Sequence, residues 1–237
     1  MALTEKQQAS LDAMGITRWV PQGSEESSAE QAVVAQTSAA PAPIESPVNA
    51  EPSTDWTALE QAVRQCKRCE LHKTRTQTVF GVGSHQADIL IIGEAPGADE
   101  DRQGEPFVGR AGQLLNEMLR AIGLARQSVY IANILKCRPP NNRDPKPEEA
   151  AQCAEYLYQQ IHLLQPKLVL ALGRIAAQRL LKTDAALARL RGKLHYLPQT
   201  QTPFIVTYHP AYLLRSPLEK RKAWDDLLFA CKTIQSN

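Results

Sequence analysis

Five cysteines are the residues of this chain best suited to binding a metal. Cys66 and Cys69 form a C-x-x-C pair, and Cys137 and Cys153 lie on either side of a loop rich in proline and asparagine. The N-terminus has no basic segment followed by an apolar one, so we expect no secretion signal, and the cysteines then favour metal binding over disulfides. Four thiolates accept either zinc or a [4Fe-4S] cluster, and spacing alone does not choose. Cys231 is left over, and we expect it to be a buried thiol.

Three polar residues at the ends of apolar segments could take part in catalysis or ligand recognition. Glu94 lies in the turn Gly93–Gly97, Asn133 lies in an apolar run, and His209 precedes Pro210. A carboxylate can stabilise positive charge or activate water, an amide offers a donor and an acceptor, and an imidazole can stabilise a departing anion. Each also has a structural alternative, because a buried Asn can satisfy neighbouring backbone and a lone His is more often structural than catalytic.

Apolar runs alternate with helical patterns along the chain. The runs predict four strands, at residues 87–92, 129–135, 168–172 and 204–207. Helices are expected from Trp56 to Cys66 and over residues 111–122, 147–164, 175–181 and 217–234, the last with an apolar face of Trp224, Leu227, Leu228 and Cys231. This alternation predicts an α/β fold, a three-layer αβα arrangement around a central, mainly parallel four-stranded sheet. Ligands bind beyond the carboxyl ends of such strands, where the three polar residues lie.

Two longer motifs resemble those of a known enzyme family. The turn Gly93–Gly97 continues through residues 98–112, ADEDRQGEPFVGRAG, and the whole stretch is similar to the first motif of the family 4 uracil-DNA glycosylases, the iron–sulfur type. Residues 207–215, TYHPAYLLR, resemble the second motif, and the resemblance runs from about Trp56 to the C-terminus. It implies a uracil-DNA glycosylase-like fold and a structural [4Fe-4S] cluster held by Cys66, Cys69, Cys137 and Cys153.

The resemblance also implies a role for each residue at the candidate site. Glu94 would lie near the reacting sugar carbon, backbone groups of the turn at Ala95 would face a uracil oxygen, and Phe107 would stack on the flipped base. Asn133 would read uracil O4 and N3–H, and His209 would donate to O2 of the departing uracil. Other branches of the superfamily place an Asp at the position of Ala95, so the residue that activates water stays open here.

The contacts to DNA are predicted from charged and apolar residues near the motifs. Arg215 would contact a phosphate, and Asn142 could support Glu94 or a phosphate. One of three apolar residues could wedge into the space left by the flipped nucleotide, and each could equally be a core residue: Tyr212, Leu213 or Leu214. Ordinary surface charge is the alternative for each of the further phosphate contacts that we expect, which are Arg138, Arg143, Lys146, Arg191 and Lys193.

These features together predict a monofunctional uracil-DNA glycosylase. It would flip deoxyuridine out of DNA, hydrolyse the N-glycosidic bond and leave an abasic site for base excision repair. No lysine is placed as a Schiff-base nucleophile, so no lyase activity is expected. Two other classes stay open: a non-catalytic iron–sulfur adaptor that binds DNA and the replisome clamp loader, and a zinc-stabilised nucleic-acid module. We expect a monomer in the cytoplasm, associated with the nucleoid. No apolar run is long enough to span a bilayer, so no membrane partner is expected.

Charge divides the chain into an acidic N-terminal part and a basic remainder. Met1 to Trp56 carries two basic and eight acidic residues, a net charge of −6, and the rest carries 25 basic and 17 acidic residues, a net charge of +8. The basic part favours a polyanion such as DNA. Residues 21–55 are rich in Ala, Ser, Pro and Glu, which predicts a disordered linker between a docking segment, 1–20, and a glycosylase domain, 56–237.

The predicted docking segment has a resemblance of its own. Residues 11–19, LDAMGITRW, resemble the N-terminal peptide of the psi subunit of DNA polymerase III, which binds the chi subunit of the clamp loader. A short amphipathic segment with an unburied Trp19 on a long tether suits docking to a partner. The resemblance implies chi as that partner, and the alternative is a helix that folds back on the body.

Overall fold

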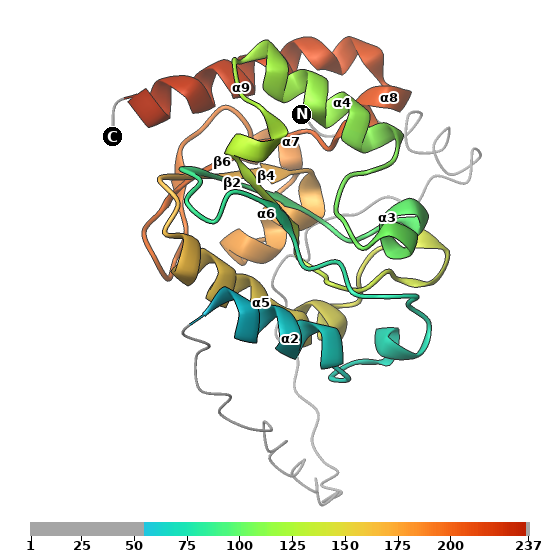
Figure 1. The fold of residues 1–237 in the computed structure, drawn as a ribbon. Coiled ribbons are helices and arrows are strands. Elements are labelled where there is room, and N and C mark those ends of the chain that lie inside the picture. Colours follow the sequence, from blue (N-terminus) through green and yellow to red (C-terminus); the bar gives the residue numbers. More distant parts are fainter. Residues whose placement is uncertain (1–54, 236–237) are drawn as a thin grey trace, which may run out of the picture. The chain divides into compact units, whose positions relative to one another are not determined.

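The computed structural model describes residues 55–235, which form three layers, with one six-stranded sheet between two layers of helices (Figure 1). The predictions for the docking segment and for the linker up to residue 54 lie outside the described residues. In residues 55–235, no helix combines the length and the apolar character needed to cross a membrane.

Four parallel strands make the centre of the sheet, in the order β3 (Tyr130–Asn133), β2 (Ile89–Gly93), β4 (Leu168–Leu172) and β6 (Pro203–Thr207). Every residue of β2, β3 and β4 is buried, as expected for parallel strands covered on both faces. The predicted central sheet is therefore confirmed. Two antiparallel edge strands extend it, β1 (Val82–Gly83) beside β3 and β5 (His195–Tyr196) beside β6. Each has only two residues, too few to show an alternating pattern in the sequence.

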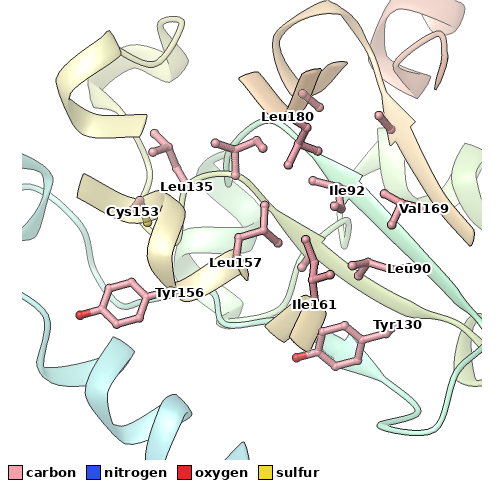
Figure 2. Close-up of a cluster of buried hydrophobic side chains, with 14 of the residues drawn as sticks. Leu90, Ile92, Tyr130, Leu135, Cys153, Tyr156, Leu157, Ile161, Val169 and Leu180 are labelled. Atoms are coloured by element: carbon pink, nitrogen blue, oxygen red, sulfur yellow. The ribbon is translucent and has the colours of Figure 1, made fainter. Parts of the chain in front are cut away.

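Helices cover both faces of the sheet because alternate strand residues point to opposite sides. Leu90 and Ile92 pack with the core formed by α2 (Trp56–Gln65), α5 (Pro147–Leu164) and α6 (Arg174–Leu181). Figure 2 shows this core, with Leu157 and Ile161 of α5 against the strands. On the other face, Ile89 and Ile91 pack with α4 (Arg110–Ala121), α8 (Pro210–Arg215) and α9 (Lys220–Gln235). The remaining elements are short: η1 (Glu70–Lys73), α3 (Ala98–Gln103), η2 (Arg126–Ser128), η3 (Pro140–Asn142), α7 (Leu187–Leu190) and η4 (Pro217–Glu219).

The last helix, α9, is rotated relative to its predicted orientation. Of the predicted apolar face only Leu227 is buried, whereas Trp224 and Leu228 are each 39% exposed and Cys231 is half-buried. The buried face instead includes the charged Asp226, which forms an ion pair of 2.7 Å with Arg191. The other buried side chains of α9 are mostly small, which allows close packing: Ala223, Leu227, Ala230 and Thr233. The hydrophobic pattern of the sequence could not reveal an ion pair with a distant residue.

Candidate active site

One cavity of about 450 Å³ opens at the carboxyl ends of the central strands. Glu94 follows β2, Asn133 ends β3 and His209 follows β6, and all three side chains line this cavity. The structure therefore brings together the three polar residues singled out in the sequence. Other predicted residues line the same cavity: Ala95, Phe107, Asn142, Arg143, Tyr212 and Arg215.

Glu94 is held by an extension of the β2–β3 pairing beyond the strands themselves. The amide of Ile134 donates to the Gly93 carbonyl at 3.0 Å, and the amide of Leu135 donates to the Glu94 carbonyl at 3.1 Å. Burial, with a smaller contribution from Asp144, raises the pKa of the Glu94 carboxyl to about 7, although Arg174 acts in the opposite direction. A carboxyl group with this pKa can exchange a proton near neutral pH, which suits general acid–base chemistry.

Asn133 carries a buried oxygen that has no hydrogen-bond partner within residues 55–235. The residue is 2% exposed, and its Oδ1 is one of three such buried side-chain atoms in this part of the chain. Gly93 faces it across the sheet, and a Cβ atom there would lie 2.4 Å from Oδ1 and 2.6 Å from Cζ of Phe107. Glycine at position 93 is thus required for the close approach of these side chains. A buried acceptor without a partner is costly, so a ligand with a donor fits this position.

Phe107 has a strained backbone. Its φ of 55° lies in the left-handed region, which costs a bulky residue of this kind on the order of 1–3 kcal/mol. Its ring centroid lies 5.5 Å from that of His209, with 31° between the planes, and its side chain is buried. Gly112 permits this arrangement, because a Cβ atom there would lie 1.7 Å from the Phe107 carbonyl oxygen. The ring is therefore fixed at the cavity wall by the backbone around it.

Two charged residues that the sequence analysis missed hold this loop. Arg126, in η2, donates to the carbonyl of Pro106 at 2.5 Å and to that of Phe107 at 3.3 Å. Glu100, in α3, accepts from the amide of Gly97 at 3.1 Å and from those of Val108 and Gly109 at 3.0 and 3.2 Å. One carboxylate thus connects the turn after β2 to the loop of Phe107. Of the two, only Glu100 could have been noticed in the sequence. It lies three residues after Gly97, the spacing at which an acid caps the start of a helix.

His209 is a neutral imidazole with a defined tautomer. It caps α8, and its Nδ1 accepts from the amide of Ala211 at 3.1 Å, so the proton of the neutral ring lies on Nε2. Burial, helped by the positive charge of Arg215, lowers the pKa of His209 to about 4. The ring therefore stays neutral at physiological pH and can donate one hydrogen bond without carrying a charge.

The loop after β3 contributes Asn142 and Arg143 to the cavity. The Oδ1 atom of Asn142 accepts from Nε of Arg138 at 2.8 Å. Arg143 makes a two-pronged ion pair with the buried Glu149, with N–O distances of 2.8 and 2.5 Å. The Arg143 side chain is 35% exposed, so part of it can still meet a ligand. The role of Asn142 as support for Glu94 stays a prediction.

Two of the predicted DNA contacts occupy positions unsuited to that role. Leu213 is 1% exposed and packs in the core under α8, whereas Leu214 and Tyr212 are each 37% exposed. Arg191 pairs with Asp226, donates to the carbonyl of Lys222 at 2.6 Å and lies over the ring of Tyr208. Both residues therefore stabilise the fold. Exposed positions remain at Lys193, Leu214 and Arg215.

The four cysteines predicted as ligands line one narrow cavity between α2, the segment after β3, and α5. Nη1 of Arg75 donates to Sγ of Cys137 at 2.9 Å, and the amide of Lys136 donates to Sγ of Cys153 at 3.3 Å. Burial raises the pKa of the Cys153 thiol to about 12 and raises those of Cys69 and Cys137. In residues 55–235, no three His, Cys, Asp or Glu side chains are grouped so that they could hold a metal ion. Four thiols around one cavity, with N–H donors directed at two sulfurs, nevertheless match the chemistry of a [4Fe-4S] cluster.

Comparisons with known proteins agree with the site. The family model described as the uracil DNA glycosylase superfamily matches residues 80–228. The chain is 47% identical over 169 residues to a type-4 uracil-DNA glycosylase of Archaeoglobus fulgidus, a match that covers 68% of this chain and 85% of the relative. Similar type-4 enzymes occur in Pyrobaculum aerophilum, with 42% identity covering 73% of this chain and 91% of the relative, and in Thermotoga maritima, with 43% identity covering 67% and 82%.

Proposed function

This chain belongs to the uracil-DNA glycosylase superfamily, and we propose that the cavity beyond β2, β3 and β6 binds a uracil flipped out of DNA. The protein is a uracil-DNA glycosylase, a hydrolase that releases uracil from DNA and leaves an abasic site for base excision repair. The observation that carries the assignment of the cavity is the unpartnered Oδ1 of Asn133, buried among the other site residues.

Asn133 reads the base through its amide. Oδ1 accepts from uracil N3–H, and the amide nitrogen donates to uracil O4. Cytosine has no proton on N3 and carries a donor in place of O4, so both hydrogen bonds would be lost. Because Asn133 lies at the buried end of β3, the lost bonds could not be replaced by water, and the discrimination is correspondingly large.

Phe107 provides the stacking surface for the flipped base. The ring is held in place before the base arrives, because Arg126, Glu100 and Gly112 fix the backbone around it. Stacking on an aromatic side chain stabilises a bound base by about 1–3 kcal/mol. A ring that is already ordered loses little conformational entropy on binding, so more of that energy is available to offset the cost of unstacking.

His209 stabilises the leaving group. As the N-glycosidic bond breaks, negative charge develops on uracil O2, and the Nε2–H group of His209 donates a hydrogen bond to it. A neutral imidazole suits this task because the bond from Ala211 to Nδ1 leaves the Nε2–H donor already oriented toward the charge that develops. Removing one such donor from other active sites lowers kcat by about 100–1,000-fold.

Glu94 acts on the sugar side of the bond. Its carboxylate stabilises the positive character that develops on the sugar, and it can accept a proton from the attacking water. Ala95 has no functional side chain, which leaves Glu94 as the carboxylate nearest this task among the residues that line the cavity, with Glu100 committed to three amides.

Cys66, Cys69, Cys137 and Cys153 would hold a [4Fe-4S] cluster. The cluster would act as a structural cross-link, joining α2, the segment after β3 and α5. Through that segment it would set the position of the loop that carries Asn142 and Arg143 into the cavity. Burial raises the pKa of the Cys137 and Cys153 thiols, so both would be protonated when no cluster is bound. Binding of the cluster would therefore release their protons.

Release of free uracil from an oligonucleotide that contains deoxyuridine tests the proposed function. We expect release by the wild type, a loss of about 100-fold or more in Asn133→Ala, and none from a matched oligonucleotide with cytosine. His162→Ala on the exposed side of α5 is the control and should behave as the wild type. A folded wild type that releases no uracil would overturn the proposal, and an unchanged Asn133→Ala would overturn the role of that residue.

The sequence alone supports a further role for residues 1–20. We propose that they dock the glycosylase domain, 56–237, to the chi subunit of the clamp loader through the linker 21–55. A pull-down with purified chi, comparing the full chain with a chain that starts at residue 21, tests this role. Retention of the full chain alone is expected, and equal retention of both chains would exclude the docking segment.

A further inference from the structure

Lys136 is a buried cation beside the cysteine cavity, and it has no carboxylate partner. The side chain is 1% exposed. Its Nζ donates to the carbonyl of Asn133 at 3.0 Å and to Oε1 of Gln160 at 2.5 Å, both of which are neutral groups. No ion pair in residues 55–235 includes Lys136, although transfer of an unpaired charge to the protein interior is costly.

Arg75 is a second cation of the same kind. It is half-buried, and its guanidinium donates to Sγ of Cys137 at 2.9 Å and to the carbonyls of Cys66 and Arg64 at 2.8 and 3.2 Å. Within the described part of the chain it too has no carboxylate in an ion pair. Arg75 therefore directs its positive charge at the thiols and at the backbone that carries them.

The third arginine or lysine that lines the cavity, Arg68, is paired with a carboxylate, as is Arg143 nearby. Arg68 pairs with Glu155 at 2.5 Å, and Arg143 pairs with Glu149 at 2.5 Å. Arg75 and Lys136 are then the two cations that line the cavity without a negative partner in residues 55–235. The cavity is thus built for a group that carries negative charge.

We propose that Arg75 and Lys136 are the counter-cations of the four-thiolate cluster and hold it in its resting charge state. The inference rests on the cofactor proposed above. Four thiolates around a core with two positive charges leave a dianion, which two cations neutralise. Positive charge beside the core stabilises its more negative states, so the two cations oppose loss of an electron and the oxidative breakdown that follows it.

Purified full-length variants test this inference without relying on activity. Arg75→Gln and Lys136→Met each remove one charge, Arg75→Lys keeps it, and Lys73→Gln removes an exposed charge in η1 as a matched control. The measurements are iron and sulfide per chain, the rate at which the visible absorbance of the cluster fades in air, and its midpoint potential by voltammetry. Circular dichroism identifies any variant that does not fold.

We expect both charge-removing variants to shift the midpoint potential to more negative values, since each weakens the stabilisation of the reduced, more negative core. Cluster loss in air should accelerate about 10–100-fold, the usual cost of losing a group that supports a metal ligand. Arg75→Lys and Lys73→Gln should stay close to the wild type. Unchanged potential and unchanged cluster lifetime in folded Arg75→Gln and Lys136→Met would overturn the inference.

The same preparations separate this inference from the proposals on which it rests. A wild type that releases uracil but contains no iron or sulfide would disprove the cofactor, and the charge assignment with it. A wild type that contains the cluster but releases no uracil would disprove the activity, while the voltammetry would still decide the role of the two cations.

Discussion

The active-site cavity and the cysteine cavity are incomplete in different ways. In the active-site cavity one buried polar atom, Oδ1 of Asn133, has no hydrogen-bond partner within residues 55–235. Around the cysteines the charges do not balance, because Arg75 and Lys136 have no carboxylate partner in that part of the chain. The first cavity therefore requires a ligand with a donor in a fixed place, and the second requires a negative group of fixed charge. The unpaired acceptor favours a ligand with a donor at that position, whereas the unpaired cations favour a ligand with net negative charge.

The largest effect should come from His209. His209→Ala removes the proposed donor to the leaving group, so kcat should fall about 100–1,000-fold. The side chain supports the fold mainly through one hydrogen bond to the amide of Ala211, so the thermal midpoint should change by only a few degrees. Single-turnover uracil release and thermal unfolding measure the two quantities. A large fall in stability with little change in kcat would assign His209 to the fold instead.

Gly93→Ala should damage the active-site cavity without disturbing the cluster. The added Cβ would collide with Asn133 and Phe107, so we expect uracil release to fall about 100-fold and stability to fall by about 1–3 kcal/mol. Gly123→Ala is the control, because its Cβ would meet open space and would add only backbone strain. Iron content and uracil release measured together test the comparison. An equal loss of iron in Gly93→Ala would mean that the two cavities are not independent.

A smaller effect is expected from the pH. Uracil release should rise about tenfold per pH unit up to about pH 7 and then level off, since Glu94 must be ionised while His209 is neutral throughout. Asp144→Asn should move this limb to lower pH, because the negative charge of Asp144 helps to raise the pKa of Glu94. If uracil release by Glu94→Gln still rose with pH over the same range, the rise would have to come from the titration of another group.

The same carboxyl group affects stability in the opposite direction. Its pKa is higher in the folded state than the ordinary value, so folding favours its protonated form. The stability that it contributes is fully present below about pH 4.5 and is lost as the pH rises to about 7. Glu94→Gln should therefore be more stable than the wild type at pH 8, on the order of 1–3 kcal/mol, and about equal at pH 4. Denaturant unfolding at both pH values measures the difference.

The smallest effect should come from Arg126. Arg126→Met leaves the carbonyls of Pro106 and Phe107 without their donor, which should cost about 1–3 kcal/mol and slow uracil release about tenfold by loosening the stacking ring. Arg126→Lys should restore part of both. Binding of a base analogue distinguishes the two causes, because a positioning role predicts weaker binding even at temperatures where the variant is fully folded.

The residues at the strand ends could be predicted from the sequence, whereas the residues that hold them in place through long-range hydrogen bonds could not. The strand Leu168–Leu172 and the helix Pro147–Leu164 agree with their predicted bounds, because continuous apolar runs and a proline before two acids are local signals. Glu94, Asn133 and His209 followed from the general property of parallel sheets that their strand ends converge. Leu213 takes the core alternative to the wedge role, and of the residues predicted to pack along α9 only Leu227 is buried, because a long-range ion pair of Asp226 helps to decide which face lies inside.

The supporting residues act across long separations in sequence. Arg75 reaches a thiol 62 positions away, and Arg126 reaches a carbonyl 19 positions away. No local pattern marks such partners, because they depend on how the loops meet after folding. Lys136 is the exception that could have been noticed: a lysine directly after Ile134 and Leu135 and before Cys137 interrupts a buried segment, and an interruption of that kind often marks a functional charge.

The continuation of the β2–β3 pairing into Ile134 and Leu135 has a consequence for hydrogen exchange. These two amides bond to the carbonyls of Gly93 and Glu94 where two buried central strands end, so we expect the backbone under the cavity to belong to the part of the molecule that opens last. Their exchange with deuterium should require global unfolding and should report the full stability of the domain. Glu94, the proposed catalytic carboxylate, would thus be carried by slowly exchanging backbone.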